Sequence, residues 1–112
     1  MKYTILVHRY AKALLDYAIK NNMVEEVLVD FQLVKETLSS SKELAAILNQ
    51  PFVSKNRKIN ILTSLFKDKV QDVTLKFIVL MIEKNRVGII VLMYDKYYEL
   101  YPSVKNYMDN II

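Results

Sequence analysis

The chain of 112 residues contains no cysteine, one glycine and two prolines. The lack of cysteine excludes disulfides, thiolate metal sites and cysteine nucleophiles, and it is consistent with a reducing compartment such as the cytoplasm. Antiparallel sheets need glycine-rich turns at short intervals, so a single glycine at position 88 argues for helices. No apolar run approaches the roughly 20 residues that span a bilayer, and His8, Arg9 and Lys12 interrupt the first one before it could form a signal peptide. We therefore expect no membrane insertion and no targeting peptide.

The composition is that of one globular domain, with 53% hydrophobic and 25% charged residues. The net charge of +4 is spread along the chain and densest between residues 55 and 69. Nucleic-acid modules cluster charge more strongly and carry a recognisable motif, so these lysines and arginines are interpreted as solvated helix faces. The alternative is a small all-helical RNA-binding factor that uses the basic residues Lys55, Arg57, Lys58, Lys67 and Lys69.

Helical spacing of apolar residues predicts an all-α fold of five or six helices in one bundle. The run 87–94 alone also fits a buried strand, but its spacing continues to residue 101 and no second strand exists to pair with it. Three capping sites are expected: Ser40 with Glu43, Ser54, and Asp68 with Gln71. Pro102 is expected to stop the last helix. The predicted helices are 6–18, 24–38, 43–49, 55–66, 71–85 and 87–101.

Two of these helices carry more apolar surface than one neighbour can cover. The apolar arc of the first helix is roughly 200° wide, and the polar strip of the fifth, formed by Asp72, Lys76 and Glu83, is only roughly 40° wide. The second helix is different, because a narrow apolar stripe leaves its polar residues outside, namely Glu25, Glu26, Asp30, Lys35 and Glu36. Residues alone leave two explanations for the first and fifth helices. Either both are central helices of the bundle, or they form a groove for a partner helix.

The chain offers almost nothing for catalysis. His8 is its only histidine, it lies at the edge of an apolar arc, and no nucleophile, metal or phosphate-binding motif accompanies it. We therefore expect no enzyme activity, no metal and no cofactor. Tyrosines at helical spacing, Tyr94, Tyr97, Tyr98 and Tyr101, predict bundle packing with hydroxyls at the rim, and a base-stacking platform is the alternative.

Three ordered blocks resemble a known family. They are RYAKALLDYA at residues 9–18, ELAAILNQPFVSKNRKINILTSLF at residues 43–66 and FIVLMIEKNRVGII at residues 77–90. Over residues 3–101 the chain resembles the N-terminal domain of the delta subunit of F-type ATP synthase, called the oligomycin-sensitivity-conferring protein in mitochondria. The resemblance implies a non-catalytic six-helix bundle, residues 1–101, followed by a tail, residues 102–112.

The resemblance also implies a partner. In the family, this domain binds the N-terminal helix of an alpha subunit in a groove between the first and fifth helices. Carried over by position, the groove residues are Tyr10, Ala13, Leu14, Tyr17, Ile78, Val79 and Ile82. Val7, Ala18, Phe77 and Met81 are expected in the core instead.

The implied role is that of a stator link in the peripheral stalk, which holds the catalytic head against the rotor during proton-driven ATP synthesis. The expected location is peripheral, on the cytoplasmic face of the cell membrane. Family members continue into a C-terminal domain that holds the b subunit of the stalk, whereas this sequence stops at Ile112. Binding to the b subunit is therefore expected only if that domain exists. The tail carries an apolar stripe, formed by Val104, Tyr107, Met108 and Ile111, and it is predicted to pack into its own or a neighbour's groove.

Overall fold

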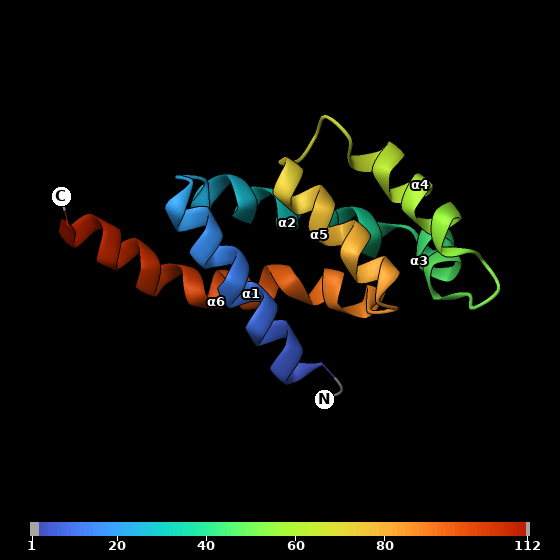
Figure 1. Ribbon diagram of the computed structural model, residues 1–112, viewed down its shortest axis with the longest axis horizontal. Coiled ribbons are helices and arrows are strands. Elements are labelled where there is room, and N and C mark those ends of the chain that lie inside the picture. Colours follow the sequence, from blue (N-terminus) through green and yellow to red (C-terminus); the bar gives the residue numbers. More distant parts are fainter. Residues whose placement is uncertain (1–2, 112) are drawn as a thin grey trace.

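The computed structural model describes the backbone of residues 3–111 and the side chains of residues 3–101. This part of the chain contains helices and no strand, which confirms the all-α six-helix bundle (Figure 1). The helices are α1 (Thr4–Lys20), α2 (Val24–Ser40), α3 (Lys42–Asn49), α4 (Lys55–Phe66), α5 (Asp72–Glu83) and α6 (Val87–Ile111).

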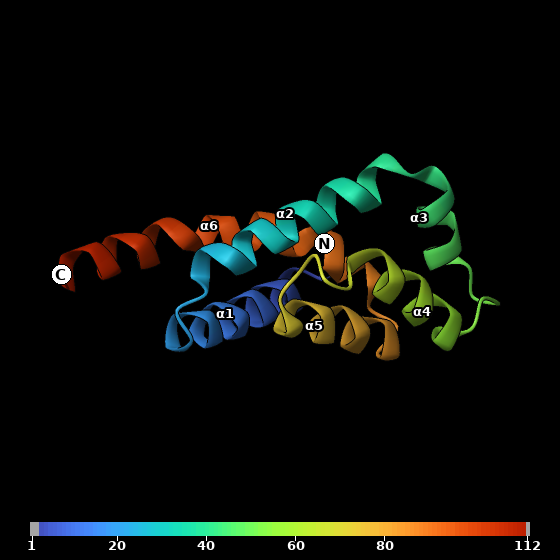
Figure 2. The ribbon, with the colours of Figure 1, turned by 90° about the horizontal axis from the view of Figure 1, so that it is seen from above.

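The helices form two layers. Seen from above, α2 and α6 lie in one layer, and α1, α5 and α4 lie in the other (Figure 2). The short helix α3 closes one end of the bundle, and the C-terminal part of α6 extends beyond the opposite end (Figures 1 and 2). Within their layer, α1 and α5 are neighbours and run in opposite directions (Figure 1).

A chain of aromatic rings joins the two layers at the core. Phe31 of α2 packs edge-on against Phe77 of α5, with ring centroids 5.6 Å apart, and lies 6.4 Å from the ring of Tyr97 in α6. Tyr97 is fully buried, and its hydroxyl donates a 2.8 Å hydrogen bond to the carbonyl of Val24 at the start of α2. The four residues predicted to be core, Val7, Ala18, Phe77 and Met81, are buried, as expected.

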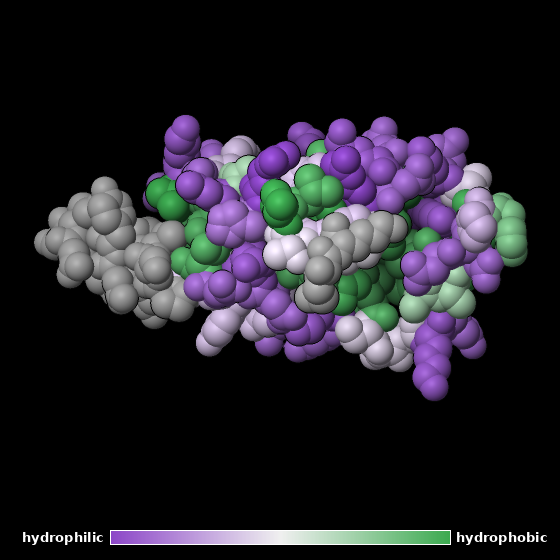
Figure 3. All heavy atoms as spheres, turned by 90° about the horizontal axis from the view of Figure 1, so that it is seen from below, coloured by the Kyte–Doolittle hydropathy of each residue, from purple (hydrophilic) through white to green (hydrophobic). Residues whose placement is uncertain are grey.

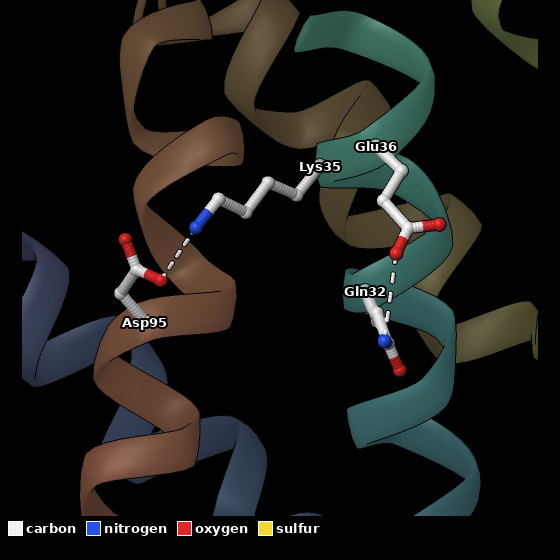
Figure 4. A network of polar contacts seen from close by, with 4 residues as sticks. All are labelled: Gln32, Lys35, Glu36 and Asp95. Atoms are coloured by element: carbon white, nitrogen blue, oxygen red, sulfur yellow. Dashed lines mark hydrogen bonds and ion pairs between the residues drawn. The ribbon is translucent and has the colours of Figure 1, made fainter.

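An ion pair between α2 and α6 lies at the surface. Lys35 forms a 2.7 Å ion pair with Asp95, while Gln32 and Glu36 form a hydrogen bond within α2 (Figure 4). Lys35 and Asp95 are both substantially exposed, so water screens their attraction and the pair adds about 0–1 kcal/mol to stability. Packing of the apolar faces, rather than ion pairing, holds these two helices together.

The predicted end of the last helix at Pro102 is wrong, because α6 continues to Ile111. Proline lacks an N–H, so one hydrogen bond of the helix is lost, the one to the carbonyl of residue 98. Tyr98 is 54% exposed, and water can reach this side of the helix. The helix therefore crosses the predicted boundary between bundle and tail. The apolar stripe predicted for the tail lies outside the described side chains.

Serine caps begin two of the helices. The hydroxyl of Ser54 accepts a 3.1 Å hydrogen bond from the backbone N–H of Arg57, which confirms the predicted cap of α4. The cap of α3 is one residue later than predicted. Ser41 has the extended backbone that a cap needs, and its hydroxyl accepts from the N–H of Leu44, whereas Ser40 is still part of α2.

Left-handed turns are made without glycine. Asn22, Asp68 and Asn85 adopt positive φ angles of 55°, 67° and 58° in the connections before α2, α5 and α6. Asparagine and aspartate tolerate this region better than other side chains do. Asp68 is therefore a turn residue, and the capping box predicted for Asp68 and Gln71 is wrong, since the side chain of neither residue caps α5.

Hydrophilic and hydrophobic side chains are both exposed at the surface (Figure 3). The face seen from below shows hydrophobic side chains in separate patches between charged ones (Figure 3). Within residues 3–111, no helix has both the length and the hydropathy needed to cross a bilayer.

Candidate partner-binding surface

The side chains of α1 and α5 meet at an aromatic pair. The ring of Tyr10 packs edge-on against Phe77, with centroids 5.7 Å apart. The hydroxyl of Tyr10 also accepts a 2.7 Å hydrogen bond from the guanidinium of Arg86, which follows α5. Phe77 is buried and Tyr10 is half-buried, so this pair forms the contact between the two helices.

Near this pair, several apolar side chains remain exposed. Ala13 is exposed on α1, and Tyr17 keeps 45% of its surface in water. On α5, Leu80 is 40% exposed and lies one turn from Phe77, on the side of the helix that faces α1. We define the α1/α5 surface as Tyr10, Ala13, Tyr17 and Leu80. It presents one methyl group, two aromatic rings and one leucine side chain to solvent.

The structure brings together only some of the predicted groove residues. Leu14, Ile78 and Ile82 are buried in the core of the domain. Val79 is half-buried and lies two residues from Phe77, about 200° around the helix, so it is on the side of α5 away from α1. Sequence reasoning missed Leu80. Its signal was present, because Leu80 follows Phe77 by three residues and so shares its side of the helix.

The other candidate residues stay apart from this surface. His8 is exposed, and among the described side chains no cluster of histidine and acidic residues could hold a metal ion. Of the basic residues in the RNA-binding alternative, Lys58 is half-buried and the other four are exposed. Lys55 is engaged by the end of α5, where its ammonium donates a 2.8 Å hydrogen bond to the carbonyl of Glu83.

The tyrosines of α6 have partners within the bundle. Burial in the core raises the pKa of Tyr97, so this hydroxyl stays protonated and donates to α2. Tyr94 lies under the ammonium of Lys35, 5.4 Å from the ring centroid, and packs against Tyr98. The hydroxyl of Tyr101 donates to Glu25. These contacts are the bundle packing expected from the spacing of the tyrosines, but the prediction that the hydroxyls lie at the rim is wrong for Tyr97, whose hydroxyl is buried.

Asp30 departs most from its prediction. It was expected on the solvated side of the second helix, yet it is buried, with 5% of its surface exposed. One oxygen, Oδ2, accepts hydrogen bonds from the N–H of Gln71, at 2.8 Å, and from the hydroxyl of Thr74, at 2.7 Å. Removal from water raises the pKa of this carboxyl, although both hydrogen bonds act to lower it; the negative charge of Glu26 raises it further.

A hollow lies on another part of the molecule. It is an open groove of about 1130 Å³ between α2, α3 and α4. Leu44, Ile47 and Ile61 line its base, and most of its other lining residues are serine, threonine and asparagine. It contains none of the predicted groove residues.

Comparison with known proteins supplies the family. A family model described as "ATP synthase delta (OSCP) subunit" matches residues 6–111. The chain belongs to this family. The ATP synthase subunit delta of Clostridium botulinum (strain 657 / Type Ba4) is 42% identical over 85 residues, which cover 76% of this chain and 48% of the relative.

A second delta relative comes from a different bacterium. The ATP synthase subunit delta of Chlorobaculum tepidum is 38% identical over 90 residues, which cover 80% of this chain and 50% of the relative. The chain thus spans about half the length of the curated relatives it matches. These matches confirm the resemblance seen in the three sequence blocks of this delta (OSCP) domain.

Proposed function

We propose that this delta (OSCP) domain is a non-catalytic stator component of an F-type ATP synthase, and that its α1/α5 surface binds the N-terminal helix of an alpha subunit. The observation that carries the proposal is the exposure of Ala13, Tyr17 and Leu80 on two neighbouring helices. Apolar side chains gathered beside each other on a helical surface are typical of a site for an amphipathic helix.

The shape of the surface suits such a partner. Ala13 has the smallest apolar side chain and lets a partner backbone approach closely, while Tyr17 and Leu80 stand on either side to contact its apolar face. Leu14, Ile78 and Ile82 are buried in the core, so they are not available to the partner. The resulting contacts are many and individually weak, so they must separate together. That property suits a link that resists torque. Surface ion pairs would be a weaker basis for such a link, because each is screened by water and contributes only about 0–1 kcal/mol.

The proposal includes a location and a limit. The domain lies peripherally on the cytoplasmic face of the membrane, in the stalk that connects the catalytic head to the membrane sector. Its function is mechanical coupling during proton-driven ATP synthesis. Contact with the b subunit of the stalk is part of the proposal only if a C-terminal domain exists.

The test is a calorimetric titration of the protein with a synthetic peptide, the N-terminal helix of the alpha subunit from the same organism. We expect saturable binding to the wild type and none to Ala13→Asp, because a carboxylate at the centre of the surface would lose its water on docking. Ala46→Asp is the matched control, since Ala46 is an exposed alanine on α3, and it should bind like the wild type. Circular dichroism should show both variants folded.

Two results would overturn the proposal. The first is a wild-type protein that does not bind the peptide. The second is equal binding by Ala13→Asp, which would move the site elsewhere. If the protein instead binds RNA with an affinity that falls steeply between low and moderate salt, the RNA-binding alternative would gain support.

A further inference from the structure

The N-terminus of α5 is capped by a residue from another helix. The residue at its cap position, Gln71, makes no side-chain cap, and the serine caps that begin α3 and α4 have no counterpart here. Instead, the carboxylate of Asp30 reaches from α2 and accepts from the N–H of Gln71. An acidic group also interacts favourably with the positive end of a helix. Asp30 therefore supplies from α2 the cap that α5 lacks.

The same carboxylate also satisfies a side chain inside α5. Thr74 is fully buried, and its hydroxyl donates to the oxygen that caps Gln71. Two hydrogen bonds about one turn apart fix both the position and the rotation of the first turn of α5 relative to α2. Without them, a backbone N–H and a buried hydroxyl would lose their acceptor.

The rotation of α5 matters for the α1/α5 surface. Phe77 lies three residues after Thr74, on the same side of the helix, and it is the residue that packs against Tyr10. Leu80 follows one turn later. A rotation of α5 at its first turn would therefore move Phe77 away from Tyr10 and shift Leu80 out of the α1/α5 surface.

We propose that Asp30, although it lies on α2 and does not touch the α1/α5 surface, is a positioning residue for that surface, because it locks the N-terminus of α5. The binding part of this inference rests on the proposed function. The buried carboxylate of Asp30, which lies outside the α1/α5 surface, then contributes to the affinity of that surface for its partner.

The test compares three variants of the full chain. Asp30→Leu removes both hydrogen bonds. Asp30→Asn keeps them, because both end on a single oxygen that the amide oxygen can replace. Leu38→Ala removes a buried side chain about 12 Å further along α2 and serves as a control for general loss of stability. Two quantities are measured, the affinity for the alpha-subunit peptide and the hydrogen exchange of the backbone amides of residues 71–77.

We expect Asp30→Leu to bind the peptide about tenfold or more weakly and to lose amide protection in the first turn of α5. Asp30→Asn should retain affinity within about threefold together with wild-type protection, and Leu38→Ala should retain both at a temperature where it is folded. If Asp30→Leu fails to fold, Thr74→Val removes one of the two hydrogen bonds and should give a smaller loss in the same direction.

The outcomes separate the two proposals. A folded Asp30→Leu, or Thr74→Val in its place, with wild-type affinity and wild-type protection would overturn the role of Asp30. So would equal weakening by Leu38→Ala, since the effect would then follow stability and not position. If the wild type does not bind the peptide, the proposed function fails. Hydrogen exchange then decides whether Asp30 locks α5.

Discussion

Replacing Tyr17 by alanine tests whether the exposed ring on α1 is a contact for the partner helix. A tyrosine side chain that is fully covered buries about 200 Å², so the 45% of Tyr17 left exposed offers about 90 Å² to a partner. At about 25 cal/mol per Å², covering it is worth about 2 kcal/mol, or about 30-fold in the dissociation constant. Association also orders the ring, so this value is an upper bound and we expect a loss of about 10- to 30-fold.

The matched control is Tyr98→Ala. Tyr98 is even more exposed, at 54%, but it packs on Tyr94, which faces Lys35 of α2 and so lies away from α1. Titration calorimetry with the alpha-subunit peptide should show weakened binding for Tyr17→Ala and wild-type affinity for Tyr98→Ala. Equal affinities for wild type and Tyr17→Ala, or equal losses in both variants, would refute the assignment of this ring to the docking surface.

Three further predictions concern the fold. Ser41→Ala should lower the free energy of unfolding by about 1 kcal/mol in urea titrations, because it removes the cap of α3, while Ser40→Ala should change it by less than about 0.5 kcal/mol; the reverse order would contradict the observed cap. Tyr97→Phe should cost about 1 kcal/mol in the same assay, because one buried hydrogen bond to Val24 is lost while the ring packing stays; an unchanged stability would contradict that bond. Burial raises the pKa of Asp30 in the folded chain above its reference value of 3.8. The protonated carboxyl therefore adds to the free energy of unfolding, fully at pH values below 3.8, and this contribution is lost as the pH rises through the pKa of the folded state. Asparagine does not titrate, so the free energy of unfolding of Asp30→Asn relative to wild type should rise over this pH range and then level off. A decrease in this difference with rising pH would contradict the raised pKa.

The spacing of apolar residues predicted the helices and much of the core correctly. A helical stripe can be recognised from the chain alone, because each turn repeats the same side of the helix. Phe77 and Met81 follow this rule and are buried, as predicted. Pro102 does not. Proline usually ends a helix because it lacks a backbone N–H, but α6 continues through Pro102, where the lost hydrogen bond lies on an exposed side of the helix.

The candidate site was less predictable because it depends on which helices become neighbours. Every position of α5 from 77 to 82 is apolar, so periodicity could not decide which of Ile78, Val79 and Leu80 faces α1. The contact between Phe77 and Tyr10 resolves this, since it fixes the rotation of α5. Asp30 could not be found from the sequence for a related reason. Its partners are 41 and 44 residues away, and a local pattern shows only that the carboxylate is polar.

The most direct measurement for the central claim is an NMR titration of the isotope-labelled protein with the alpha-subunit peptide, followed through backbone amide shifts. The account predicts that the largest changes fall on α1 at residues 10–17 and on α5 at residues 77–80, with small changes in α3. Changes concentrated on the groove between α2, α3 and α4, or no changes at saturating peptide, would contradict it.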